Sequence, residues 1–320
     1  MSIKEAFSNK NSTLRRSFGK EKITKKLLLI FELILLIGLS FIILYPFLIK
    51  LSAAFMSVED TYDDTVSLIP RHPTFDNIKY IFTELPMMKA LIGTLVLSLV
   101  VAVLTTVTAT LVGYGLAKFR FYGKRIIIFF VLFSLLIPFS TIIVPTYMYF
   151  RYFDMFGILS LITGSSISTI NTAFPVGFLA ATGLGFRGGL YILIMYQAFK
   201  GLPQELDEAG MVDGAGIART FIEINIPLVK SMMLVVFVIS FAWQWTDKNY
   251  SDLLFSNTNL FPQILTQIST HAETSLGNGT YVQSLISNGA LLIMIMPLLI
   301  LYCFVQRQLV QGIERTGLVG

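Results

Sequence analysis

Residues Pro203 to Ser231 read PQELDEAGMVDGAGIARTFIEINIPLVKS, a charged, glycine-punctuated stretch in an otherwise apolar chain. Pro203 suits the first turn of a helix, where its missing N–H costs nothing. The acidic residues Glu205, Asp207 and Glu208 follow in that turn, where carboxylates interact favourably with the helix dipole. The start of the stretch is therefore predicted to be a short helix, with an apolar face made by Leu202, Leu206, Ala209 and Val212.

A tight turn is predicted after this helix. Asp213, Gly214, Ala215 and Gly216 stand together, and two glycines permit a sharp reversal of the chain. A second short helix is expected from about Ile217 to Asn225, with Pro227 ending it and starting the next apolar segment. Its apolar stripe consists of Ile217, Phe221 and Ile224. The stretch thus predicts a helix–turn–helix unit.

The composition of the whole chain points to a membrane protein. Its 320 residues are 54% hydrophobic and 13% charged, whereas soluble domains usually carry about 25% charged residues. The mean hydropathy is +0.72. So few charges cannot cover a surface that faces water, so the lipid bilayer is the expected solvent. The single cysteine, Cys303, excludes an intrachain disulfide and a cysteine cluster for a metal.

Apolar segments predict six transmembrane helices. Most reach the ~20 residues that cross ~30 Å of hydrocarbon as a helix. A sixth region, about Thr172–Phe199, has glycines in its middle and is read as one broken span, with Leu159–Asn171 partly outside it. Two short crossings there are the alternative, and they would reverse everything downstream. The five clearer segments are Leu27–Ile49, Ala90–Ala117, Ile126–Phe150, Leu228–Trp245 and Val282–Val305.

Lysines and arginines set the predicted orientation. Residues 1–26 form a strongly basic segment, and KFRFYGKR at Lys118–Arg125 is basic without an acid, so both are expected in the cytoplasm. The connection between the first two spans is acidic and is expected outside. Six crossings within a membrane domain of residues 27–306 place the polar stretch and the tail, residues 307–320, inside. Because the charges follow the membrane topology, the net charge of +5 does not indicate nucleic-acid binding.

The polar stretch resembles the EAA loop of permease subunits of bacterial ABC importers, and the chain from about residue 27 onward is most similar to maltose-type carbohydrate permeases of the second-subunit kind. Gly210 departs from the usual alanine. The resemblance implies an all-α membrane protein with six transmembrane helices, the type I importer fold, and a cytoplasmic coupling loop at about 202–227. The matching residues are Glu208, Ala209, Gly210, Asp213, Gly214, Ala215, Phe221, Ile224, Asn225, Ile226 and Pro227.

The resemblance also implies a function and partners. The chain would be a transport subunit and not an enzyme. It would pair with a second permease, two copies of a cytosolic ATPase and an extracytoplasmic solute-binding protein in a bacterial cytoplasmic membrane. The sequence has no GxxxxGK[ST] phosphate loop, so ATP and Mg would be bound by the ATPase and no cofactor by this chain. Residues expected to contact or position the ATPase joint also include Glu205 and Ile217.

Candidates for a solute path lie in the spans. Trp243, Gln244 and Trp245 at the outer end of the fifth span suit sugar recognition, although an aromatic belt at the membrane interface is the commoner reason for tryptophans in such a place. Asn288 and Thr106 are further candidates, but threonines in such helices often bond back to their own backbone.

Three other interpretations stay open. The solute of an importer of this kind need not be a carbohydrate. A stand-alone secondary transporter would require charged ion-coupling sites within the spans, and it would leave the polar stretch unexplained. A membrane enzyme would require paired carboxylates or a histidine cluster, which the spans lack, and no metal site is predicted because His72 and His271 stand far apart. The acidic outer connection is either a solvated loop or the landing surface for the solute-binding protein.

Overall fold

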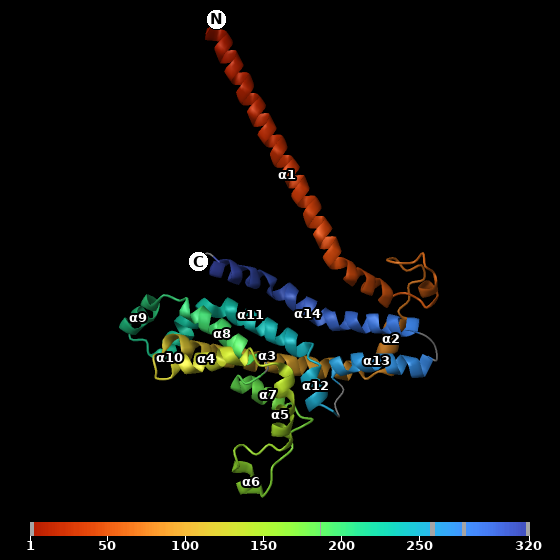
Figure 1. Cartoon of the computed structure of the whole chain (residues 1–320), viewed down its shortest axis with the longest axis vertical. Coiled ribbons are helices and arrows are strands. Elements are labelled where there is room, and N and C mark those ends of the chain that lie inside the picture. Colours follow the sequence, from red (N-terminus) through yellow and green to blue (C-terminus); the bar gives the residue numbers. More distant parts are fainter. Residues whose placement is uncertain (1–2, 186, 257–259, 277–279, 318–320) are drawn as a thin grey trace. The chain divides into compact units, whose positions relative to one another are not determined.

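The computed structural model describes residues 3–185, 187–256, 260–276 and 280–317, with side chains from residue 25 to 268 and from 281 to 309 apart from those gaps. Its regular elements in these ranges are helices, with one isolated antiparallel bridge between Phe153 and Ile167. The chain forms two compact units, Met1–Thr74 and Phe75–Gly320 (Figure 1).

The first unit contains a long helix and a folded connection. Helix α1 (Ile3–Ala54) runs without a break through the basic segment into the first apolar segment, so the backbone there is helical. The connection holds a short 3-10 helix, η1 (Glu59–Tyr62), and Asp60 accepts hydrogen bonds from the N–H and Nδ1 of His72, each at 2.9 Å. Arg71 pairs with Asp63. This connection is therefore folded by its own polar contacts.

Helix α3 is at the centre of the second unit. It packs against α7, α8 and α11, and α11 packs against α14 (Figure 1). The elements of this unit are α2 (Asp76–Glu84), α3 (Met87–Lys118), α4 (Lys124–Ser134), α5 (Phe139–Arg151), α6 (Ile158–Thr163), α7 (Phe174–Thr182), α8 (Gly188–Lys200), α9 (Gln204–Val212), α10 (Ile217–Arg219), the π-helical segment η2 (Thr220–Asn225), α11 (Ile226–Trp245), α12 (Asn249–Leu254), α13 (Phe261–Leu276) and α14 (Thr280–Gly317).

A glycine allows α3 and α8 to cross closely. A Cβ atom added at Gly113 would lie 2.7 Å from the Cβ atom of Met195 and 2.8 Å from the backbone nitrogen of Tyr196. Small residues bring helix backbones together in membranes, where packing and not the hydrophobic effect drives helix association. Gly113 and Met195 thus fix the crossing on which the buried cluster around Tyr114, Phe199 and Val236 is built.

The third apolar segment is not one straight span. Residues 126–150 were predicted as a single helix, but α4 and α5 meet at a bend of 104°. Pro138 explains the error, because proline lacks the backbone N–H that a continuing helix needs and disfavours helical geometry in the preceding residue. It stands as the N-cap of α5 with an extended ψ of 140°. A run of apolar residues around Pro138 conceals this break from a hydropathy pattern.

The glycine-rich interruption in the next apolar region is confirmed. Helix α7 ends at Thr182 and α8 begins at Gly188, with Gly183 in the left-handed region at φ +73°. A Cβ atom at Gly188 would lie 2.0 Å from the carbonyl oxygen of Gly183. The break therefore requires glycine at both of its ends.

Four helices in the described ranges are long and apolar enough to cross a membrane: Lys25–Ala54, Met87–Lys118, Ile217–Trp245 and Tyr281–Leu309. The bent pair α4–α5 makes up to five. The helical character and most apolar spans of the prediction are thus observed, whereas a sixth crossing stays a prediction.

Candidate functional site

The polar loop, defined here as residues 202–227, begins with α9. Pro203 is the N-cap of this helix, and Glu205 and Asp207 stand in its first turn. At its end, the N–H of Ala215 donates to the carbonyl of Gly210 at 2.9 Å and that of Gly214 to Met211 at 3.1 Å. These two bonds form a Schellman motif, which requires a left-handed residue, and Gly214 supplies it at φ +82°.

The second part of the polar loop differs from the prediction at Pro227. A separate helix was expected to end there, but α10, η2 and α11 form one continuous helix, Ile217–Trp245. The N–H of Ile226 donates to Phe221, five residues earlier, as in a π-helix. Pro227 lies at the start of α11, where the wider register has already changed the hydrogen-bond pattern. η2 and α11 are therefore parts of one helix.

Helix α9 packs directly on η2. A Cβ atom at Gly210 would lie 2.7 Å from the Cδ1 atom of Ile224, the mobile end of that side chain, so Gly210 and Ile224 are in direct contact. The centroid of the Phe221 ring lies 4.5 Å from that of Tyr114 on α3 and 6.2 Å from that of Phe199 on α8. Phe221 thus faces the helical body and holds the loop on α3 and α8, whereas Ile224 packs against α9.

Asp207 connects α9 to two other elements. Its Oδ2 atom lies 2.7 Å from the Nζ atom of Lys118, the last residue of α3, and these side chains are 15% and 10% exposed. Its Oδ1 atom accepts a hydrogen bond of 2.7 Å from Nδ2 of Asn225, the last residue of η2. Asn225 is 1% exposed and also donates to the carbonyl of Thr220. One carboxylate therefore joins α9, α3 and η2.

The opposite face of the polar loop is open. Val212 is 87% exposed and Ile217 54%, and Leu206 and Met211 are exposed beside them. The predicted residues that share this open face are Glu205, Glu208, Ala209, Asp213, Gly214 and Ile217, whereas Ala215 is half-buried. An ordered apolar patch with acidic neighbours is typical of a docking surface.

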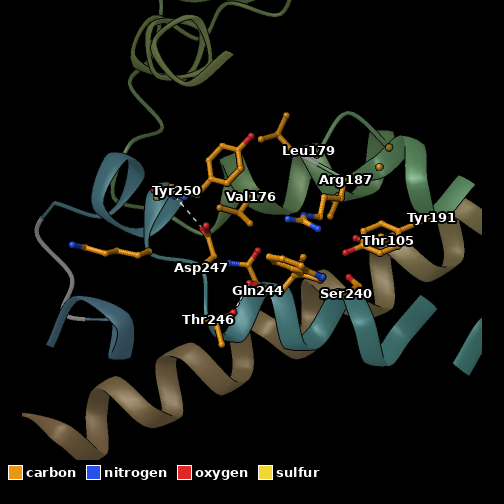
Figure 2. A pocket seen from close by; sticks show the side chains of 18 residues that line it. Thr105, Val176, Leu179, Arg187, Tyr191, Ser240, Gln244, Thr246, Asp247 and Tyr250 are labelled. Atoms are coloured by element: carbon orange, nitrogen blue, oxygen red, sulfur yellow. Dashed lines mark hydrogen bonds between the residues drawn. The ribbon is translucent and has the colours of Figure 1, made fainter. Parts of the chain in front are cut away.

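A cavity of about 430 Å³ lies near the other end of α11. Its wall is built by α3, α7, the turn before α8, the start of α8, the end of α11 and the segment into α12 (Figure 2). Such a volume falls in the range of about 300–1,000 Å³ that is usual for small-molecule sites. The lining residues are Val101, Thr105, Val176, Leu179, Ala180, Gly183, Gly185, Arg187, Gly188, Tyr191, Ser240, Trp243, Gln244, Thr246, Asp247, Lys248, Asn249 and Tyr250.

Charged and aromatic groups meet in this cavity. The Arg187 guanidinium carbon lies 3.1 Å from the ring centroid of Trp243, a cation–π contact. Asp247 accepts a hydrogen bond of 3.1 Å from the N–H of Tyr250 (Figure 2). Burial raises the pKa of Asp247 to about 6, against the lowering effect of backbone N–H groups at Tyr250 and Asn249. The carboxyl therefore titrates just below neutral pH.

The predicted solute-path residues have different places. Trp243 and Gln244 line the cavity. Trp245 is 1% exposed, and its Nε1 donates to the carbonyl of Met294 at 2.9 Å, so it joins α11 to α14. Thr106 donates to the carbonyl of Ala102 on its own helix, as threonines in such helices often do.

Asn288 stands on α14 beside Ser284, outside the residues that line the cavity. Thr105, the residue before Thr106 on α3, does contribute to the cavity wall.

The residues that pair over long chain separations carry no local pattern in the sequence. Lys118 stands in a basic connection and Asp207 in the first turn of a helix, and only the fold brings them together. Arg187 and Asp247 were not singled out. Charges beside the glycine break and beside the end of a span were the available signals, because intramembrane and near-membrane charges mark functional positions.

A family model matches residues 109–315 of the chain, and its description is "Binding-protein-dependent transport system inner membrane component". The diacetylchitobiose uptake system permease protein NgcG of Streptomyces coelicolor is 26% identical over 282 residues, which are 88% of this chain and 86% of that protein. The maltodextrin transport system permease protein MdxG of Bacillus subtilis is 29% identical over 286 residues, 88% of this chain and 93% of that protein.

A solved structure supports the fold. A chain of a bacterial ABC transporter involved in the import of the acidic polysaccharide alginate matches with a TM-score of 0.69 at 18% identity, over 89% of this chain and 97% of that one. A second structure shows the bacterial alginate transporter in complex with an alginate pentasaccharide-bound periplasmic protein, with a TM-score of 0.64 at 17% identity, over 89% and 94% of the two chains.

Proposed function

Because the chain belongs to the binding-protein-dependent transport system inner membrane component family, we propose that it is the permease subunit of an ATP-driven importer whose solute is a carbohydrate. The relatives named for diacetylchitobiose and maltodextrin support the solute class. The subunit contributes half of a translocation path, and a separate ATPase hydrolyses ATP.

The polar loop is the joint with the ATPase. Its inner face is fixed to the helical body by Phe221 and Asp207, while its outer face exposes Val212 and Ile217. This division is the single observation that carries the proposal, because a loop that rested on its own bundle would hide its apolar side chains. Glu205 and Glu208 stand at the rim of the exposed face and supply charge-assisted hydrogen bonds to the partner.

The cavity at the other end of α11 belongs to the solute path. Gln244 offers an amide to sugar hydroxyls, and Trp243 offers an indole ring. The Arg187 guanidinium already covers one face of that ring, so a pyranose stacks on it only on the other face or after Arg187 moves. Trp245, Thr106 and Asn288 act at most indirectly, by supporting the helices that carry the cavity wall.

The cavity also favours a second candidate, an importer of an anionic solute. Arg187 and Lys248 both line it, and a guanidinium stacked on an aromatic ring still presents N–H groups at its edge. A relative from Pectobacterium atrosepticum, 27% identical over 290 residues that are 89% of this chain and 95% of that protein, is named for sn-glycerol-3-phosphate transport. Uptake of neutral and anionic sugars by one reconstituted complex distinguishes the candidates.

The assembly and topology follow from this function. Six crossings, with α4–α5 and α7–α8 as the two broken spans, place both termini and the polar loop on the cytoplasmic side of a bacterial cell membrane. The partners are a second permease, two copies of a cytosolic ATPase, which bind ATP and Mg, and an extracytoplasmic solute-binding protein. The self-folded connection that contains Asp60 and His72 faces that binding protein.

Co-purification with the ATPase tests the function. The wild-type chain, expressed together with the permease and the ATPase encoded beside it, should retain the ATPase in detergent. Addition of the solute-binding protein, loaded with each sugar of a panel in turn, should stimulate ATP hydrolysis. Glu208→Lys should insert in the membrane and lose both properties. Normal stimulated ATPase activity in Glu208→Lys would exclude the polar loop as the joint.

A further inference from the structure

The Asp207 carboxylate ties the polar loop to α3 by a contact independent of the covalent path through η2. Its two oxygens are divided between two elements: Oδ2 lies 2.7 Å from Lys118 Nζ on α3, and Oδ1 accepts from Asn225 Nδ2 on η2 at the same distance. The neighbouring residue Glu208 is exposed. Of these two adjacent acids on α9, one is therefore bound to the helical body and the other is open to solvent.

Three helices that meet the polar loop lead to the cavity. Helix α8 runs directly into the loop and contributes Gly188 and Tyr191 to the cavity wall. Helix α11 continues from η2 and contributes Ser240, Trp243 and Gln244 to the cavity wall. Helix α3 contributes Val101 and Thr105, and it ends at Lys118. Thirteen residues of rigid helix separate Thr105 from Lys118, which is about 20 Å at 1.5 Å per residue. A displacement of α9 therefore reaches the cavity along α8 and α11 through the backbone, and along α3 through side chains.

The connections differ in kind. Those to α8 and α11 are continuous backbone, and the contact of Gly210 with Ile224 reinforces the one to α11. The polar connection to α3 passes through one ion pair whose side chains are 10% and 15% exposed, so water screens it weakly. Tyr114 on α3 contacts Phe221 of η2, but a ring contact can slide, whereas a charge pair fixes a distance.

We propose that Lys118 and Asp207 are positioning residues that make α3 follow the polar loop, so that the ATPase moves α3 and α11 together. The proposal rests on the proposed function of the polar loop and adds a second transmission branch to it. Loss of the ion pair leaves the ATPase docked through Glu208 and the exposed apolar face. It also leaves α8 and α11 driven through the backbone. Only the α3 side of the cavity stops responding to the binding of nucleotide by the ATPase.

The test follows each branch with its own reporter. Thr105→Cys reports on α3 and Gln244→Cys on α11, each in a Cys303→Ser background, because Cys303 is the single cysteine of the chain. The complex with the second permease and the ATPase is reconstituted in liposomes. The rate at which a charged methanethiosulfonate reagent modifies this subunit is measured without nucleotide and after trapping with ATP and vanadate.

The variants isolate the ion pair. Asp207→Asn keeps an oxygen that accepts from Asn225 and removes only the charge, and Lys118→Met removes the charge from the other side. Lys118→Arg is the conservative variant that restores a charge pair. Arg219→Ala is the matched control, because it breaks an ion pair with Glu223 in the same loop whose side chains are 65% and 58% exposed.

We expect both reporters to respond to trapping in the parent, in Lys118→Arg and in Arg219→Ala. In Asp207→Asn and Lys118→Met, the Thr105→Cys reporter should lose its response while the Gln244→Cys reporter and ATPase co-purification persist. A Thr105→Cys response equal to that of the parent in both variants overturns the proposal, as does joint loss of both reporters with the ATPase still bound. Failure of the parent complex to bind the ATPase contradicts the proposed function instead.

Discussion

Lys118 Nζ lies 2.7 Å from Asp207 Oδ2, so the last residue of α3 pairs with the first turn of α9. Removing one partner of a largely buried pair leaves an uncompensated charge, which costs about 3–5 kcal/mol when burial is complete. Because both side chains keep some contact with solvent, Lys118→Met should lower the free energy of unfolding by about 2 kcal/mol.

The double variant Lys118→Met/Asp207→Asn checks that this loss comes from a stranded charge. It removes both charges and keeps the Asn225 hydrogen bond, so it should be more stable than Lys118→Met alone. Thermal unfolding of the detergent-solubilised protein measures both. Losses that simply add would show that the two side chains do not interact.

The α3–α8 crossing gives a second prediction. Gly113→Ala places a methyl group against the Met195 Cβ atom and the Tyr196 backbone, and overpacking of this kind costs about 1–3 kcal/mol. Gly115 on the same helix is the control, because a Cβ atom there meets nothing within 4 Å. Gly115→Ala should be neutral or slightly stabilising in the same thermal measurement. Equal effects at the two positions would contradict the close crossing.

The turn of the polar loop gives a third prediction. Gly214 has φ +82°, and a side chain in the left-handed region costs about 1–2 kcal/mol. Gly214→Val should therefore distort the Schellman turn and reduce ATPase co-purification while membrane insertion persists. Gly216, at φ −71° with open space around it, is the control, and Gly216→Ala should co-purify normally. A Gly214→Val variant that binds the ATPase like the wild type would show that the turn geometry is not required.

A fourth prediction concerns pH. Burial raises the pKa of Asp247 from 3.8 to about 6, so the folded protein holds this proton more tightly than the unfolded chain. Its contribution to stability therefore falls as pH rises from about 4 to about 6 and is constant above that window. Asp247→Asn removes the effect, so the melting temperature of Asp247→Asn should rise relative to wild type across this window. A constant difference between the two melting curves from pH 4 to 7 would contradict the raised pKa.

Local signals predicted much of this structure. The glycines around Gly185 predicted the break between α7 and α8, and Pro203 with the Asp213–Gly216 turn predicted α9 and its end. Pro138 was missed because the surrounding residues are uniformly apolar. The prediction at Pro227 was wrong because a sequence alone does not distinguish a proline that starts a helix from one that ends the preceding helix. The π-helical register of η2, through which the helix continues past Pro227, is seen only in the structure.

The site was less predictable than the fold. The residues of the polar loop were found from a contiguous pattern, but its division into an inner and an outer face depends on packing against α3 and α8. Phe221 turned inward to Tyr114, while Ile217, on the same predicted stripe, turned outward. Arg187 meets Trp243 only because the α7–α8 break and the end of α11 come together in space.

A photo-crosslinker in place of Val212 tests the central claim most directly. Val212 on α9 and Leu161 on α6 are both 87% exposed, so they differ in location and not in accessibility. The assembled complex should give a covalent product with the ATPase from position 212 and none from position 161. Capture of the ATPase from position 161, or failure to capture it from position 212 in a complex that still hydrolyses ATP, would contradict docking on the polar loop.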